Sequence, residues 1–212
     1  MSEKPNSGRA TNTAGERRRQ AILDAAWSLF LEKGYPAVSV DEIISVSGGS
    51  KSTVYKFFGN KEGILKVLTE SFADDMIREI NLPVQPGQSP REKIRRIGLY
   101  IGKQILSEYA INHHRFAVCN AKDFPEVAWI WYESGPSKTF ESLADFLGKE
   151  TQAGRLNIKN PKRAALFFLG MIGFKDNMTM LIGADPPSGS ELEAIVDEAV
   201  DVFMAAYGKQ GT

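Results

Sequence analysis

Apolar residues recur at helical spacing along most of the chain, separated by polar positions and by glycine and proline breaks. In the first such group the spacing is i, i+3, i+4, i+7 and i+8, which places the side chains on one face of a helix. This face consists of Ile22, Ala25, Ala26, Leu29 and Phe30. Gly34 is the expected end of the helix. Residues 1–15, which precede the helix, contain almost no apolar side chains, and we expect a flexible tail there.

The rest of the chain shows the same helical spacing, without the alternation that a β-strand would have. Pro83, Pro86 and Gly87 interrupt the pattern and separate two halves, and a further break is expected at Gly135-Pro136. Beyond the first third of the chain, the expected helices cover about residues 60–80, 89–107, 111–121, 125–153 and 160–182, and from 188 onwards. The sequence therefore predicts an all-α protein.

Residues 39–58 have the pattern of two short helices joined by a glycine turn. The turn is Ser47-Gly48-Gly49-Ser50, because glycine accepts the positive φ that a sharp corner needs. Ser39 and Glu42 predict a capping box for the first helix, and Ser50 is placed to cap the second. The apolar residues on the facing sides are Val40, Ile43, Ile44, Val54, Phe57 and Phe58. This combination is typical of a helix-turn-helix, which places its second helix in the major groove of DNA.

The second helix of this motif carries polar and cationic side chains on the face away from the apolar residues. We expect Lys51, Ser52 and Lys56 to meet base edges, since lysine donates well to guanine O6 and N7. The hydroxyls of Thr53 and Tyr55 suit phosphate contacts, which position the helix without reading sequence. The full set of predicted DNA-contacting residues is Ser39, Ser50, Lys51, Ser52, Thr53, Tyr55, Lys56 and Lys61.

Two groups of cations flank the motif. Lys61 lies at the N-terminus of the following helix, where its ammonium and the backbone N–H groups can hold a phosphate together. Arg17, Arg18 and Arg19 suggest a basic arm beside the duplex, although a run of charge is also typical of a solvated surface.

The net charge of the whole chain is zero, but the charge is unevenly divided. Residues 1–66 hold 10 Lys and Arg against 7 Asp and Glu, a balance of +3, and residues 67–212 hold 16 against 19, a balance of −3. Charges beyond the Debye length of about 10 Å have little effect on a phosphate contact. The helix-turn-helix pattern thus lies in the basic part, although so small an excess also fits a solvated surface.

Several segments in the first third of the chain share the pattern of one known family. They are Ala21–Ala26, Leu29-Phe30, Lys33-Gly34-Tyr35 and Thr53–Glu62. The stretch from Arg19 through Leu65 resembles the DNA-binding domain of the TetR family of transcriptional regulators. Ile44 and Ser47 stand where that family usually has alanine, and Gly49 stands where it usually has a branched apolar residue. The resemblance implies a phosphate-binding role for Lys61.

The domain organisation follows from the motif and the proline-rich break. We expect an N-terminal three-helix helix-turn-helix DNA-binding domain over residues 16–66, and a C-terminal helical ligand-binding and dimerisation domain over residues 67–212. The TetR resemblance implies a sequence-specific regulator that represses transcription at a palindromic operator and leaves when a small, largely apolar inducer binds. A DNA-binding regulator that responds to no ligand is the alternative. The helix over about 60–80 joins both parts and is the expected lever.

The last two helices predict how the chain assembles. Residues 164–174 are apolar all round, which indicates burial on every side, and the final helix carries a single apolar stripe. The residues of that stripe are Leu192, Ile195, Val196, Ala199 and Phe203. A homodimer through these two helices would cover surface that one domain cannot, and the resemblance implies the same. The alternative is that both helices are internal core.

The C-terminal half is rich in aromatic residues and methionine, which can line an adaptable apolar cavity but are also typical of plain core. The candidate polar anchors in this half are His113, His114, Asn120 and Asn177. The resemblance implies an inducer pocket between these helices. The candidate ligand-binding residues are Tyr100, His113, Phe116, Asn120, Trp129, Tyr132, Phe167, Met171, Phe174 and Asn177.

An all-helical enzyme is the alternative from another class. The residues that suggest it are His113, His114, Cys119, Asp123 and Glu126, which lie close together in sequence. Their spacing fits no known metal signature, and neighbouring residues on a helix point about 100° apart. We therefore expect no enzymatic activity and no cofactor. A polar N-terminus, a single cysteine and no apolar run long enough for a membrane span predict a cytoplasmic protein.

Overall fold

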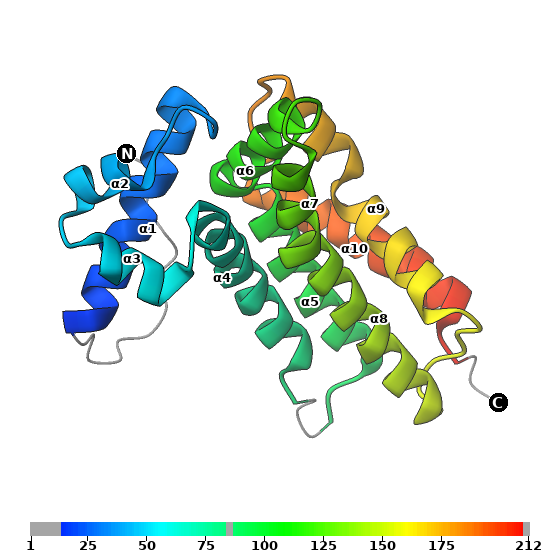
Figure 1. The fold of residues 1–212 in the computed structure, drawn as a ribbon. Coiled ribbons are helices and arrows are strands. Elements are labelled where there is room, and N and C mark those ends of the chain that lie inside the picture. Colours follow the sequence, from blue (N-terminus) through cyan, green and yellow to red (C-terminus); the bar gives the residue numbers. More distant parts are fainter. Residues whose placement is uncertain (1–13, 84–86, 210–212) are drawn as a thin grey trace. The chain divides into compact units, whose positions relative to one another are not determined.

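The computed structural model describes residues 14–83 and 87–209, so most of the tail expected over residues 1–15 lies outside the described residues. In the described residues the chain forms ten helices and no β-strand, which confirms the predicted all-α fold (Figure 1). The helices form two compact units. The first unit comprises residues 14–71 and 116–134, and the second comprises residues 72–115 and 135–209.

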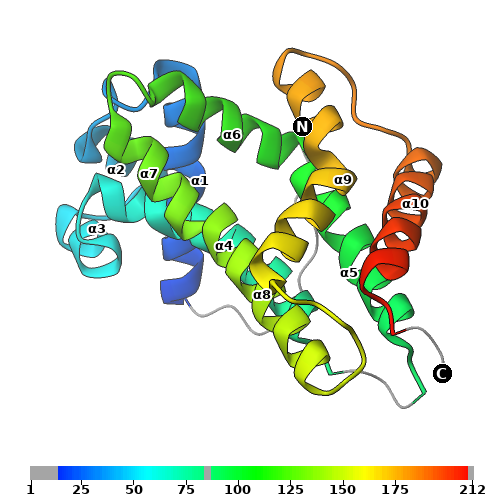
Figure 2. The same cartoon turned by 90° about the vertical axis from the view of Figure 1, so that its right-hand side faces the viewer.

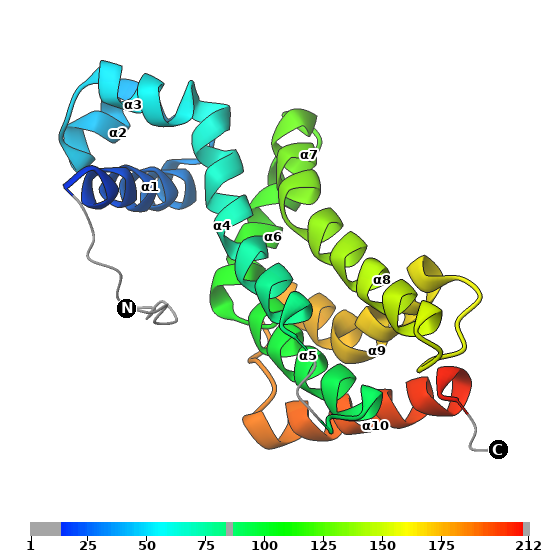
Figure 3. The same ribbon diagram turned by 90° about the horizontal axis from the view of Figure 1, so that it is seen from below.

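The first unit contains the predicted helix-turn-helix, which Figure 3 shows grouped with the first helix. Its helices are α1 (Ala14–Lys33), α2 (Val40–Ser47), α3 (Lys51–Phe58), the start of α4 (Lys61–Asn81), the end of α6 (Glu108–Asn120) and α7 (Pro125–Ser134). The second unit is built on α5, α8, α9 and α10, with the remainders of α4 and α6 (Figure 2). Their bounds are α5 (Pro90–Ile105), α8 (Pro136–Gln152), α9 (Pro161–Leu181) and α10 (Gly189–Tyr207).

Helix starts follow local capping chemistry. Ser89 and Ser188 each form a complete capping box, with Glu92 and Glu191 respectively, where helices were expected to start at about residues 89 and 188. At Ser39 only half of the predicted box forms: its Oγ accepts from the N–H of Glu42 at 3.2 Å. The carboxylate of Glu42 instead pairs with the ammonium of Lys33, because α1 brings that charge within reach.

The helix expected over about 111–121 begins earlier, at Glu108. The Oγ of Ser107 accepts from the N–H of Ala110 at 3.2 Å and so caps the start of α6. The break expected at Gly135-Pro136 does divide α7 from α8. Proline lacks an N–H and its ring fixes φ, so it suits the first position of the new helix.

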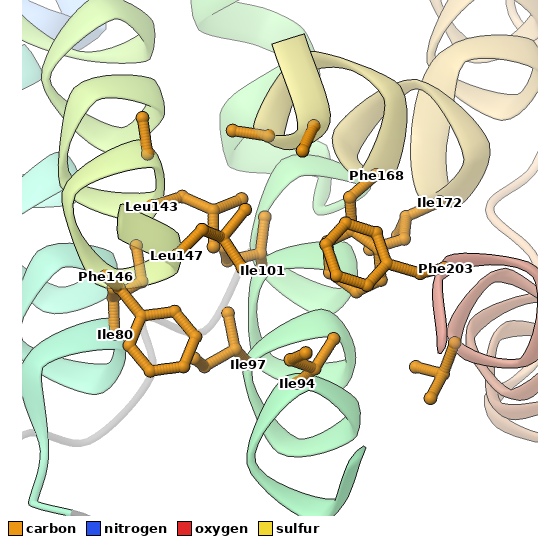
Figure 4. Packing of buried hydrophobic residues seen from close by; sticks show 14 of the residues in the cluster. Ile80, Ile94, Ile97, Ile101, Leu143, Phe146, Leu147, Phe168, Ile172 and Phe203 are labelled. Atoms are coloured by element: carbon orange, nitrogen blue, oxygen red, sulfur yellow. The ribbon is translucent and has the colours of Figure 1, made fainter. Parts of the chain in front are cut away.

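The core of the second unit packs around α5 (Figure 4). Ile97 and Ile101 of α5 lie between Leu147 of α8 and Phe168 of α9. The ring of Phe168 meets that of Phe203 on α10 edge to face, with centroids 5.2 Å apart. With Met76 and Ile80 of α4, five helices thus share one continuous apolar core.

An aromatic cluster completes the core of the first unit. The ring of Phe116 lies 5.5 Å from Trp27, 6.0 Å from Phe30 and 6.3 Å from Tyr35, measured between centroids. Val127 of α7 is fully buried in the same cluster. The unit that carries the helix-turn-helix therefore includes residues far along the chain. The expected boundary between the DNA-binding part and the ligand-binding part, between residues 66 and 67, stays a prediction.

No helix within residues 14–83 and 87–209 combines the length and the apolar character needed to cross a membrane.

Candidate nucleic-acid interface

Helix α3 has one buried and one exposed side, as a recognition helix requires. Val54 and Phe58 are buried in the core of the first unit together with Ile43 of α2. The opposite side is solvent-exposed and consists of Lys51, Ser52, Tyr55 and Lys56. Tyr55 is 55% exposed although its side chain is large, so no described residue of the first unit buries it.

The N-terminus of α3 gathers three hydroxyl groups. Ser50 caps the helix, since its Oγ accepts from the N–H of Thr53 at 3.3 Å. The same oxygen lies 2.7 Å from the Oγ of Ser52 and 3.0 Å from the Oγ1 of Thr53. First-turn N–H groups and hydroxyls can both donate to a phosphate. The arrangement suits the predicted backbone contacts, which stay a prediction.

Lys51 is paired with a carboxylate on the neighbouring helix. Its Nζ lies 2.9 Å from Asp41, and the hydrogen bond to that carboxylate raises the pKa of Lys51. Both side chains are more than half exposed, so solvent screens the pair and it holds the lysine only weakly. A guanine that accepts from Lys51 must compete with Asp41, while the exposed Lys56 lies one turn further along α3.

The junction between α3 and α4 depends on Gly63, a residue that was not predicted to be important. A Cβ on Gly63 would lie 1.7 Å from the carbonyl oxygen of Phe58, so only glycine fits. Its N–H donates to the Oδ1 of Asn60 at 2.8 Å, which caps α4. Glycine has a helix propensity about 1 kcal/mol less favourable than that of alanine. A glycine near the start of an otherwise helical pattern was therefore the signal in the sequence that this position is special.

Lys61 points into the protein rather than outward. Its Nζ donates to the carbonyl oxygens of Tyr35 at 2.9 Å and Val38 at 3.0 Å, and lies 4.2 Å from the centroid of the Tyr35 ring. Burial lowers the pKa of this lysine. Two of its three N–H groups already hold the loop between α1 and α2, which leaves one for the predicted phosphate. Contact between the third and a phosphate stays a prediction.

The candidate ligand-binding residues do not share one site, because four of them belong to the first unit. Phe116 lies in the aromatic core, and Asn120 donates to its carbonyl oxygen at 2.8 Å. Trp129 and Tyr132 form an exposed edge-to-face pair on α7, with centroids 5.8 Å apart. Packing divides the chain after Arg115 and assigns these four residues to the first unit, and their contact with a ligand stays a prediction.

Three further candidates lie on an exposed face of α9. Phe167, Met171 and Phe174 are 51%, 37% and 70% exposed. They recur at helical spacing and point away from the core side of the helix, which buries Phe168 and Ile172. Burial all round α9 therefore does not occur within a single chain, and contact between these residues and a ligand stays a prediction.

The remaining candidates, Tyr100, His113 and Asn177, lie in the second unit. The Oδ1 of Asn177 lies 3.0 Å from the Nδ1 of His114 and accepts a hydrogen bond from it in the tautomer that carries the proton on Nδ1. His113 is 4% exposed, and its Nδ1 lies 2.8 Å from the carbonyl oxygen of Tyr109. Burial lowers the pKa of His113 to about 4.

An open groove of about 480 Å³ on the second unit contains none of the candidate ligand residues. Its lining is mostly polar and consists of Ile77, Asn81, Ser137, Lys138, Glu141, Ser142, Asp145 and Lys149. In the described parts of the chain, no group of three or more His, Cys, Asp or Glu side chains is placed to hold a metal ion.

Comparisons with known families give two matches. Residues 22–68 match the model for bacterial regulatory proteins of the tetR family. Residues 92–209 match the model for the C-terminal domain of the AefR-like transcriptional repressor. The second match alone covers more than half of the chain.

The curated relatives align mainly with the first part of the chain. The HTH-type transcriptional regulator YdeS of Bacillus subtilis is 42% identical over 62 residues, which are 29% of this chain and 31% of YdeS. The chain spans less than half the length of this relative.

Solved structures align over nearly the full length. A TetR-family transcriptional regulator from Mesorhizobium loti has a TM-score of 0.78 and 27% identity, over 93% of this chain and all of that one. The flavonoid-responsive regulator FrrA has a TM-score of 0.76 and 27% identity, over 92% of this chain and 99% of its own.

We expect Lys61→Met to lower the free energy of unfolding by about 1–3 kcal/mol, because it leaves the carbonyls of Tyr35 and Val38 without their donor. Lys66→Met, at an exposed position of α4, is the matched control and should change stability by less than about 0.5 kcal/mol. Urea unfolding gives both values. Unchanged stability together with a smaller salt slope of DNA binding would assign Lys61 to a phosphate instead.

The buried His113 should make stability depend on pH. Its pKa of about 4 lies below the usual value of about 6.5, so the unfolded chain takes up the proton first and acid favours unfolding. Between pH 6.5 and pH 5 this amounts to about 2 kcal/mol. Unfolding free energies of wild type and His113→Gln at pH 7 and pH 5 test it: the variant should lose less stability. The half-buried His114, replaced by Gln, should have a smaller effect, and identical pH dependence of wild type and His113→Gln would contradict the prediction.

Proposed function

The chain belongs to the TetR family of bacterial transcriptional regulators, and we propose that it is a homodimeric repressor that a small, largely apolar molecule releases from a palindromic operator. The observation that carries the proposal is the exposed face of α3, which presents lysine, serine and tyrosine side chains over a fully buried inner face. A short helix supported in this way can enter a major groove without losing its packing.

Repression is supported by the second family match, whose description is that of a transcriptional repressor. A protein that occupies an operator at a promoter excludes RNA polymerase by its bulk alone. Release then requires only that the bound molecule weakens DNA binding.

The exposed apolar stripe of α9 supports the homodimer. Its members are Leu166, Phe167, Met171, Phe174 and Met178, together with Ile182 directly after the helix, and their exposures lie between 37% and 87%. A contiguous apolar surface of this kind usually marks an interface, because water disfavours it by about 25 cal/mol for each Å². A second copy of α9 offers the same surface, and a two-fold dimer pairs identical patches. Two recognition helices can then read two half-sites about 34 Å apart.

The ligand class is supported by composition and by one relative. The flavonoid-responsive regulator FrrA aligns over nearly the whole chain, and flavonoids are planar and largely aromatic. We place the ligand among the helices of the second unit, with Tyr100, His113 and Asn177 as candidate polar contacts. At neutral pH His113 is uncharged because burial lowers its pKa, and a neutral imidazole suits an apolar ligand better than an imidazolium does.

Release requires that the ligand binds one arrangement of the dimer more tightly than another, since a ligand shifts an equilibrium only by its differential affinity. Helix α4 runs without interruption from the first unit into the second, from Lys61 to Asn81. A rotation of its C-terminal half in the second unit therefore acts directly on the residues that follow α3. We propose α4 as the lever of release.

Selection of genomic fragments by the purified protein, followed by footprinting, tests the function as a whole. We expect a two-fold symmetric site near a promoter, with an affinity that falls steeply as salt rises. A flavonoid series should then lower the affinity for that site. Absence of any enriched sequence at low salt would contradict specific DNA binding. An operator that keeps its affinity with every bound ligand would favour a regulator that responds to no ligand.

Charge on the apolar stripe of α9 should separate the two copies. We expect Phe174→Glu to convert a dimer into a monomer in sedimentation analysis, and to weaken operator binding at least about tenfold, because each copy loses a phenylalanine contact. Val118→Glu changes an exposed apolar residue of α6, outside the stripe, and is the matched control. A monomeric wild type, or a dimeric Phe174→Glu, would exclude this interface.

A further inference from the structure

We propose that Arg18 is a positioning residue for DNA recognition: it fixes the turn before α3 and thereby sets the angle at which α3 enters the groove. The inference rests on the proposed DNA binding and adds a residue of α1 to the recognition machinery. It differs from the expectation that Arg18 forms part of a loose basic arm.

The turn between α2 and α3 has an unusual backbone. Gly48 and Gly49 both have positive φ, at 74° and 105°. The N–H of Gly48 donates to the carbonyl oxygen of Ile44 at 2.8 Å and so closes the last turn of α2. Two successive glycines also give a chain its greatest freedom, so this turn needs an external contact to hold one conformation.

Arg18 provides that contact. Its Nη1 donates to the carbonyl oxygen of Ser47, the last residue of α2, at 2.7 Å. A Cβ on Gly48 would lie 2.9 Å from this Nη1, and one on Gly49 would lie 3.5 Å from the Cδ of Arg18. The arginine therefore lies along both glycines, in space that a side chain would occupy. A cation at the C-terminal end of α2 also interacts favourably with the helix dipole.

The next residue of α1 holds the opposite end of α3. The guanidinium carbon of Arg19 lies 5.6 Å from the centroid of the Phe58 ring, and Phe58 is the last residue of α3. Arg18 thus contacts the turn before the recognition helix α3, and the neighbouring Arg19 contacts the final residue of α3. Because Arg18 and Arg19 belong to the same turn of α1, they hold α3 at a fixed angle to that helix.

The angle matters because α3 is short. Eight residues span about 12 Å, so a tilt of about 10° moves one end by about 2 Å. Hydrogen bonds to base edges tolerate only a few tenths of an ångström, whereas phosphate contacts by flexible cations tolerate more. Loss of the contact with the turn should therefore reduce sequence preference more than affinity for DNA in general.

Arg18→Gln tests the proposal, with Arg17→Gln as the matched control for loss of one charge at an exposed neighbour. The DNA probes are the duplex that wild type enriches from a random library and a random duplex of the same length. We expect Arg18→Gln to weaken binding to the enriched duplex about tenfold, to change binding to the random duplex less than about twofold, and to leave the salt slope unchanged. Equal losses on both duplexes, with a salt slope smaller by about one phosphate, would make Arg18 a phosphate contact and overturn the proposal.

Hydrogen exchange of the DNA-free protein gives a second readout that does not depend on an operator. Peptides covering residues 45–52 should exchange several-fold faster in Arg18→Gln than in wild type or Arg17→Gln. Unchanged exchange would overturn the proposal even if DNA binding falls. If wild type enriches no duplex, the proposed function fails, and the exchange rates still decide whether Arg18 holds the turn.

Discussion

The recognition surface depends on the burial of one side of an eight-residue helix. Two turns of helix are not stable alone in water, so α3 owes its existence and its direction to its neighbours. Val54 and Phe58 supply the apolar contacts, while Gly63 lets α4 begin directly against the end of α3. The residues proposed to contact DNA can be polar because those beneath them are apolar and buried.

The second unit combines an internal core with an exposed apolar face on one of its helices. Its helices share one core centred on α5, and α9 and α10 both belong to it while α9 keeps a second apolar face toward solvent. A helix apolar on opposite sides can serve an interior and an interface at once. Arg115 supports this helix, since its guanidinium donates to the carbonyl oxygens of Met180 and Leu181 at the end of α9. The very next residue, Phe116, is part of the other unit's core.

Local chemistry in the sequence was sufficient to predict the helices and the helix-turn-helix. Serine caps and the glycine turn act over three or four residues. The predicted cap was confirmed at Ser50, and the helices expected from about residues 89 and 188 begin at Pro90 and Gly189. The site was less predictable, because what a side chain touches depends on residues distant in sequence. From the sequence alone, Lys61 is expected to face solvent. Only the fold brings the carbonyls of Tyr35 and Val38 beside it. Helical periodicity likewise marks Phe167 and Phe174 as apolar without indicating which face of α9 is covered.

The first unit is discontinuous along the chain, and this restricts how the protein can be recombined. Residues 116–134 return to the helix-turn-helix after the chain has already built part of the second unit. A hybrid regulator joined at a single point after α4 would pair Trp27, Phe30 and Tyr35 with a foreign residue in place of Phe116. A hybrid with a new DNA specificity must therefore take residues 116–134 from the same relative as the helix-turn-helix. Otherwise only the outer face of α3 can be changed. Gene fusions that leave this segment out would exchange the helix-turn-helix but leave a cavity in the core of the first unit.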